Sequence, residues 1–145
     1  MDDLYYARLA KLKRELSAER KKREKKKKKF TPNQQIMINF INNVTKSAVF
    51  EINGKKIILR KGNSFGGFKH ILEKHYCSGC NGEITLLDIL NMDLTIQRGL
   101  LLNNTGVTNK DNIVYSYLKS SLQYKLVLKE EKENQLVVTY YTVDR

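Results

Sequence analysis

The chain has 145 residues, which is enough for one domain with a hydrophobic core but not for two. Its formal net charge is +12, and its hydrophobic fraction of 41% is ordinary for a globular protein. Charged residues begin at Asp2, no apolar run approaches the roughly 20 residues of a membrane span, and two cysteines do not form the disulfide framework of a small secreted domain. We therefore expect a cytoplasmic protein with no membrane partner.

The composition of residues 1–30 predicts that they form a basic, Lys-rich helical leader or arm in front of the folded domain. This segment contains 13 Lys and Arg residues against 5 Asp and Glu residues. Leu9, Leu12 and Leu16 share one side of the predicted helix. A run of like charges repels itself and is usually solvated. The segment is therefore either a phosphate-binding arm or a solvated helix or linker.

We expect residues 31–145 to form a single domain whose first element is a helix. Thr31 is a suitable helix cap and Pro32 a suitable first helical residue. An apolar stripe at helical spacing follows and predicts core positions: Ile36, Met37, Phe40, Ile41 and Val44. The dipeptide Asn53-Gly54 suits a two-residue type I′ turn between two short strands.

A second helical region and three strands complete the expected fold. Thr85 and Asp88 form a capping-box variant before a leucine-rich helix that Gly99 can end. From Asn112 onward, "NIVYSYL", "YKLVLK" and "QLVVTYYTV" have the alternation or β-branching of strands. The expected fold class is α+β, with N-terminal helices followed by a small antiparallel β-sheet, preceded by the basic helical leader.

All the histidines and cysteines of the chain lie in the stretch "GGFKHILEKHYCSGC", residues 66–80. His70, His75, Cys77 and Cys80 are the right residue types for a tetrahedral zinc site. However, zinc modules usually bring two ligand pairs together across a loop or hairpin, whereas these four residues lie within eleven positions. A non-catalytic, zinc-stabilised nucleic-acid-binding module is therefore kept as an alternative.

The two histidines also suit acid–base chemistry. A histidine titrates near about 6.5, so a pair can hold one neutral and one protonated ring at neutral pH. Such a pair can cleave RNA without a metal, one ring deprotonating the ribose 2′-hydroxyl and the other protonating the leaving 5′-oxygen. Arg60, Lys61 and Lys69 are nearby cations that could stabilise the phosphate charge.

The spacing of the histidines limits how they can meet. Five positions on a continuous helix put His70 and His75 roughly 140° apart around the axis. Either the helix ends near Lys74, or the substrate lies across the helix terminus, or only one histidine is catalytic.

The last predicted strand carries a second group of candidates. Alternate residues of a strand share a face, so Thr139 and Tyr141 point together while Tyr140 and Thr142 point the opposite way. A hydroxyl beside a phenol suits a phosphate contact with base stacking, and Tyr140 is a further candidate for substrate binding.

The helix "GGFKHILEKH" together with the terminal "VVTYY" resembles the barnase/EndoU/colicin/RelE-like (BECR) nuclease superfamily, phage- or toxin-associated branch, over residues 45–145. The resemblance implies a metal-independent endoribonuclease that needs no cofactor and leaves a 2′,3′-cyclic phosphate. It implies a catalytic set from two segments: His70, His75, Thr139, Tyr141, and Lys69 or Lys61 as the lysine. The Cys77–Cys80 loop is not part of that pattern.

The same resemblance implies the partners. RNA, with tRNA as one candidate, would be the substrate, and a toxin would have an immunity or antitoxin protein. A third hypothesis, from a different class, is an accessory structural protein of a phage particle whose basic arm touches packaged nucleic acid.

Overall fold

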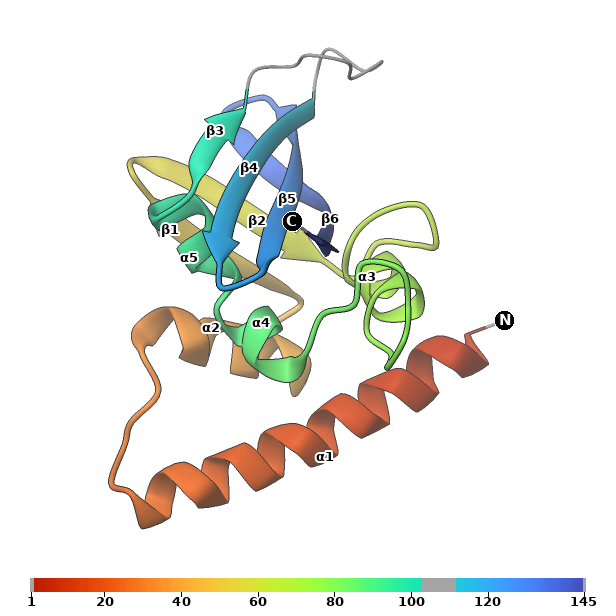
Figure 1. Cartoon of the computed structure of the whole chain (residues 1–145), viewed down its shortest axis with the longest axis vertical. Coiled ribbons are helices and arrows are strands. Elements are labelled where there is room, and N and C mark those ends of the chain that lie inside the picture. Colours follow the sequence, from red (N-terminus) through yellow and green to blue (C-terminus); the bar gives the residue numbers. More distant parts are fainter. Residues whose placement is uncertain (1, 103–111, 145) are drawn as a thin grey trace.

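The computed structural model describes residues 2–102 and 112–144 and has an α+β fold (Figure 1). Its elements in chain order are α1 (Asp3–Lys25), α2 (Pro32–Ile41), β1 (Ser47–Ile52), β2 (Lys55–Arg60), α3 (Phe68–Lys74), α4 (Leu86–Leu90), α5 (Met92–Gln97), β3 (Leu100–Leu102), β4 (Asn112–Lys119), β5 (Leu122–Glu131) and β6 (Asn134–Asp144). The predicted α+β class with N-terminal helices is confirmed, but the sheet is mostly rather than wholly antiparallel, and its strands β1 and β2 precede α3, α4 and α5. Within the described ranges, no helix has the length and apolarity of a membrane span.

Among the described residues, the sheet has six strands in the order β1-β2-β6-β5-β4-β3. All neighbouring strands are antiparallel except β2 and β6, which are parallel. The last strand therefore lies inside the sheet, between the β1–β2 hairpin and the β3–β5 meander. The hairpin turns at Asn53 and Gly54, whose φ angles of 53° and 78° are the left-handed values of a type I′ turn, as predicted.

The predicted helix starts are confirmed, and one predicted helix is divided. The Thr31 hydroxyl accepts a hydrogen bond from the backbone N–H of Gln34, whose side chain bonds back to the Thr31 N–H. Thr85 and Asp88 form the same reciprocal cap on α4. The leucine-rich segment is two short helices separated at Asn91.

The basic leader is docked on the fold rather than extended as an arm. In Figure 1, α1 is the outermost element on the helical side of the molecule. Its buried side chains belong to the same hydrophobic core as the rest of the chain: Tyr5, Leu9, Leu12 and Leu16. The predicted apolar side of this helix is therefore an interior surface, while Lys26 to Lys29 beyond its end are exposed. Of the stripe predicted for α2, Val44 lies outside the helix and is 70% exposed.

The docking of α1 predicts a stability effect from a single truncation. Leu12 is 0% exposed, so Leu12→Ala leaves a cavity and should lower the free energy of unfolding by about 2–5 kcal/mol. Arg14→Ala, two positions away on the exposed side, should change it by less than about 0.5 kcal/mol. Urea unfolding followed by circular dichroism measures both values. Equal, small effects of the two variants would show that α1 does not pack on the domain.

Candidate active site

The helix that carries the histidines is anchored to the sheet at its start. The N–H of Gly67, the residue before α3, donates to the carbonyl of Val138 in β6 over 2.9 Å. Val138 is the extra residue of a β-bulge, because Val127 pairs with Thr139 while Leu128 pairs with Val137. Gly67 has φ of 97°, and a Cβ atom there would lie 3.0 Å from the carbonyl oxygen of Arg60, so only glycine fits this junction. The bulge thus joins α3 to the strand that carries the other candidates.

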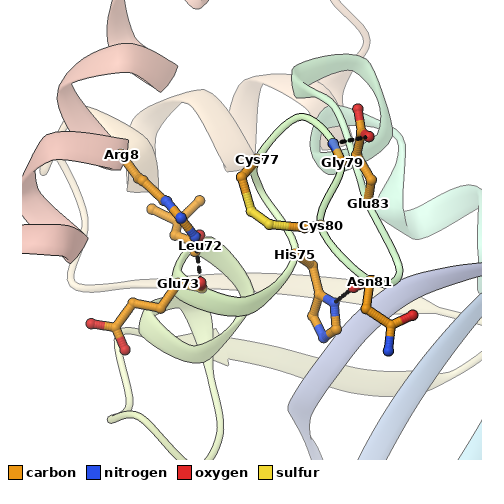
Figure 2. Close-up of a disulfide and its surroundings, with 9 residues drawn as sticks. All are labelled: Arg8, Leu72, Glu73, His75, Cys77, Gly79, Cys80, Asn81 and Glu83. Carbon is orange, nitrogen blue, oxygen red and sulfur yellow. Dashed lines mark hydrogen bonds between the residues drawn. A yellow bond between two sulfur atoms is a disulfide. The ribbon is translucent and has the colours of Figure 1, made fainter.

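The end of α3 is held by α1 (Figure 2). The Arg8 guanidinium donates to the carbonyl of Leu72, at 2.9 Å, and to that of Glu73, both in the last turn of α3. The phenol of Tyr76, just beyond the helix, donates to the carboxylate of Glu15. A cation at a helix C-terminus satisfies free carbonyls and interacts favourably with the helix dipole. The first helix therefore fixes the position of the histidine helix.

The two histidine rings lie edge to face beside each other because α3 ends at Lys74. His75 follows as the C-terminal cap, so it leaves the helical path, and the ring centroids of His70 and His75 lie 5.6 Å apart at 70°. Of the three arrangements that the spacing allowed, the structure has the helix end near Lys74.

Both rings are fixed in the same tautomer by backbone carbonyls. Nδ1 of His70 lies 2.9 Å from the carbonyl oxygen of Ser64, and Nδ1 of His75 lies 2.9 Å from that of Asn81. A carbonyl oxygen only accepts hydrogen bonds, so each Nδ1 carries a proton. Nε2 is consequently the atom at which each ring gains or loses a proton.

The pKa of His75 is lowered. The largest cause is burial, which disfavours the charged ring, and the positive charges of His70 and Lys74 act in the same direction. The hydrogen bond to the Asn81 carbonyl raises the pKa and opposes these effects in part. His75 is therefore the ring suited to be neutral at physiological pH.

The loop after His75 is held in place by a disulfide and by hydrogen bonds. A disulfide joins Cys77 to Cys80, and the N–H of Gly79 donates to the Glu83 carboxylate over 2.9 Å (Figure 2). The N–H of Ile84 donates to the carbonyl of His75, also over 2.9 Å. These bonds hold the Asn81 carbonyl that orients His75.

Gly82 is where this loop, His75 and β6 meet. Its φ is 71°, and an added Cβ would lie 3.0 Å from His75 Nδ1 and 3.0 Å from the Cβ of Tyr141. The Tyr141 ring stacks on the His75 ring, with centroids 5.5 Å apart and planes at 25°. The absence of a side chain at Gly82 therefore allows this stacked pair to form beside the loop.

The predicted catalytic histidines of α3 and the predicted Thr139 and Tyr141 of β6 lie in one cleft of about 1000 Å³. Its described lining residues are His70, His75, Cys80, Asn81, Gly82, Glu83, Thr85, Asp88, Leu122, Tyr124, Thr139, Tyr141, Thr142 and Val143. His70 and His75 thus share a cleft with Thr139 and Tyr141. The hydroxyl oxygen of Thr139 is buried and has no hydrogen-bond partner among the described residues.

The predicted cations are not among the described residues that line this cleft. Lys69 forms an ion pair with Asp2 at 2.8 Å, and it approaches Glu73 at 3.9 Å. Lys61 lies 3.7 Å from Asp2 and over the ring of Tyr5. Arg60 is exposed at the end of β2. Lys61 and Lys69 thus help to dock the start of α1 and lie outside the described lining of the cleft.

Tyr140 is also corrected as a substrate contact. Its side chain is 2% exposed, and its hydroxyl lies 3.1 Å from the hydroxyl of Thr95 in α5. The alternation of the strand was predicted correctly, but it turns Tyr140 into the core. A buried, hydrogen-bonded phenol cannot stack on a substrate base.

The four residues of the zinc alternative are not arranged as a ligand set. The sulfur atoms of Cys77 and Cys80 are bonded to each other, and both histidines use Nδ1 for backbone carbonyls. In the part of the chain that the structure describes, no group of three or more His, Cys, Asp and Glu side chains is placed to hold a metal ion.

Two residues of the site's surroundings were missed by sequence reasoning. Lys125 in β5 pairs directly with Tyr141, so both side chains project from the same face of the sheet. No sequence signal identifies Lys125, because the pairing depends on strand register. Gly82 carried a weak signal as a glycine after the cysteine pair, but its contacts with His75 and Tyr141 follow only from the fold.

Comparisons of the sequence with protein-family models and with curated proteins find no match. The resemblance to BECR nucleases therefore remains a prediction. The chemistry of the cleft is the basis on which a function can be proposed.

Proposed function

We propose that the chain is a metal-independent endoribonuclease of the kind that the BECR resemblance implies. One observation carries the proposal. The only two histidines in the sequence lie in one cleft, with their ring centroids 5.6 Å apart. In each ring Nδ1 is hydrogen-bonded to a backbone carbonyl, which leaves Nε2 for proton exchange. Paired imidazoles that share a cleft with hydroxyl groups are suited to phosphodiester transfer.

His75 is assigned as the general base. Its lowered pKa keeps Nε2 unprotonated at neutral pH, so this nitrogen can take the proton of the ribose 2′-hydroxyl. The 2′-oxygen then forms a bond to phosphorus. The Asn81 carbonyl stabilises the positive charge that the ring gains in this step.

His70 is assigned as the general acid. Protonated at Nε2, it donates that proton to the 5′-oxygen as the bond between phosphorus and this oxygen breaks. The products are a 2′,3′-cyclic phosphate and a free 5′-hydroxyl. The proton removed by His75 and the proton supplied by His70 balance, and neither an oxidant nor a reductant is consumed.

The β6 residues and Lys125 would bind the phosphate. The Thr139 hydroxyl is buried and has no partner among the described residues, so a rotation of the side chain into the cleft would let it donate to a non-bridging oxygen. Tyr141 holds the His75 ring by stacking and presents its phenol to the cleft. Lys125 lies opposite Tyr141 on the same face of the sheet, outside the described lining of the cleft, and its long side chain makes it the candidate cation in place of Lys61 and Lys69, which are engaged at α1.

The exposed lysines after α1 would add affinity for RNA that depends on salt rather than on sequence. The proposal also includes a substrate such as tRNA and an origin in a phage or toxin system. It includes an immunity or antitoxin protein as the partner. They are supported by the resemblance and by the basic charge of the chain.

The decisive experiment incubates the purified protein with total RNA in excess chelator. Cleavage should persist, should yield 2′,3′-cyclic phosphate ends, and should not occur on DNA of the same sequence, which has no 2′-hydroxyl. Tyr141→Ala should reduce the rate, whereas Tyr6→Ala, which alters an exposed tyrosine of α1, should not. Intact RNA under every condition would overturn the proposal. Zinc retained stoichiometrically by the reduced protein, without cleavage, would favour the zinc-stabilised binding module.

A further inference from the structure

Phe65 is 89% exposed, the highest value among the large hydrophobic side chains of the described residues. It lies in the turn between β2 and α3, residues 61–67, which precedes the histidine helix. A single exposed apolar side chain is common on protein surfaces and needs no functional explanation by itself. What distinguishes Phe65 is the way in which its turn is built and what the turn contacts.

The turn holds the Phe65 backbone in one conformation. The N–H of Phe65 donates to the side-chain oxygen of Asn63 over 2.8 Å, and the N–H of Asn63 donates to the carbonyl of Gly66 over 2.9 Å. Gly62 has φ of 67°, and a Cβ atom there would lie 2.0 Å from the same Gly66 carbonyl. These contacts make a tight turn in which the phenylalanine is the outward-facing residue.

The same turn contacts both the histidine helix and β6. The carbonyl of Ser64, the residue before Phe65, accepts the hydrogen bond from His70 Nδ1 at 2.9 Å. Gly66, the residue after it, packs against Val138 at the bulge of β6. Phe65 is therefore presented from a turn whose two neighbouring residues contact α3 and β6, the two elements that supply the cleft.

We propose that Phe65 is a specificity-determining residue that stacks on a nucleobase of single-stranded RNA. The base is the one on the leaving-group side of the scissile phosphate. This side follows from the chemistry, because the turn is bonded to His70, and His70 is the ring that protonates the leaving 5′-oxygen. The inference rests on the proposed function and adds to it the position of one substrate base.

Stacking on Phe65 favours single strands. Every base has an aromatic face, so the contact tolerates different sequences, but the face is accessible only when the base is not stacked in a duplex. The protruding ring thus selects unpaired RNA next to the cleft. It takes no part in the proton transfers, which the histidines carry out.

A fluorescence experiment tests the stacking without requiring cleavage. The chain has no tryptophan, so Phe65→Trp introduces a single indole at the tip of the turn. A single-stranded 2′-O-methyl oligonucleotide, which cannot be cleaved by 2′-hydroxyl attack, should quench this indole in a saturable manner. A duplex and an abasic strand of equal length should not. Val44→Trp, at another exposed position, should show no quenching and controls for non-specific binding of the polyanion.

Kinetics test the side on which the base stacks. Phe65→Ala should lower kcat/KM for single-stranded RNA by roughly 5- to 150-fold through KM, with kcat little changed, and Phe65→Tyr should restore it. A substrate whose leaving group is methanol rather than a nucleoside should be insensitive to Phe65→Ala. An equal loss with that substrate would overturn the inference, because it would show that Phe65 acts through His70.

The failures of the two proposals are distinguishable. RNA cleavage by the wild-type protein, together with no quenching of Phe65→Trp and an unchanged KM for Phe65→Ala, would overturn the stacking inference alone. Quenching in a protein that cleaves no RNA would overturn the nuclease and leave Phe65 as a base-binding residue.

Discussion

Replacement of His75 by alanine is expected to lower the rate of RNA cleavage by about 10²- to 10⁴-fold, because the proposed mechanism then loses the group that removes the 2′-hydroxyl proton. The fold should persist, since the ring is one wall of an open cleft and the loop around it keeps the disulfide and the Ile84 hydrogen bond. The measurement is single-turnover cleavage of a defined RNA, with circular dichroism as the control for folding.

The pH dependence provides an independent test of the same residue. A general base works when unprotonated, so kcat/KM should fall on the acidic side as pH drops through the pKa of His75, below the ordinary value for histidine of about 6.5. In His70→Gln one of the charges that lowers this pKa is removed, so the pKa of His75 should rise. Burial, the largest cause, remains, so it should stay below the ordinary value.

Nuclear magnetic resonance reads this pKa directly, because His70→Gln leaves His75 as the only histidine in the chain. A His75 pKa above the ordinary value in that variant would contradict its assignment as the base. So would a cleavage rate that His75→Ala leaves unchanged.

A second large loss of cleavage activity is expected from Gly82→Ala, with Gly79→Ala as the control. Both glycines lie in the loop after α3 and have left-handed φ angles, 71° and 81°, so alanine should destabilise the fold by about 1–2 kcal/mol at either position. Only at Gly82 does the new methyl group meet His75 and Tyr141, each at 3.0 Å, while around Gly79 no atom lies within 4 Å. Gly82→Ala should therefore also displace the stacked ring pair by a few tenths of an ångström and reduce cleavage by about 10-fold, less than the roughly 10²-fold loss that a 1 Å misplacement can cause.

The comparison separates backbone strain from displacement of the rings. Urea unfolding should give similar losses of stability for the two variants, and the cleavage assay should give a loss for Gly82→Ala alone. Equal cleavage rates in the two variants would show that the contacts of Gly82 do not set the geometry of the site.

Much of the fold was predictable because its signals are local. The cap at Thr31, the turn at Asn53-Gly54 and the alternation around Tyr141 each depend on residues within a few positions of one another. The meeting of His70 with Thr139, far apart in the sequence, was expected only through the family resemblance and the order of the elements. The structure places them in one cleft.

The placements that the sequence did not predict depend on contacts between distant segments. Lys69 is turned to Asp2 because α1 docks beside α3, and Tyr140 is buried because α5 packs over its face of the sheet. Lys125 is placed opposite Tyr141 by the register of β5 and β6. A linear pattern carries no information about such pairings, so the cation of the site could not be chosen from neighbours in the sequence.

The position of β6 has a consequence for the order in which the protein is made. This strand follows every other described element along the chain, yet it pairs with β2 on one side and β5 on the other. A nascent chain that has already exposed both histidines still lacks Thr139 and Tyr141, and its sheet is open where β6 will insert. The cleft can therefore form only after β6 has left the ribosome, so a nascent chain that stops short of β6 would hold only part of the candidate site.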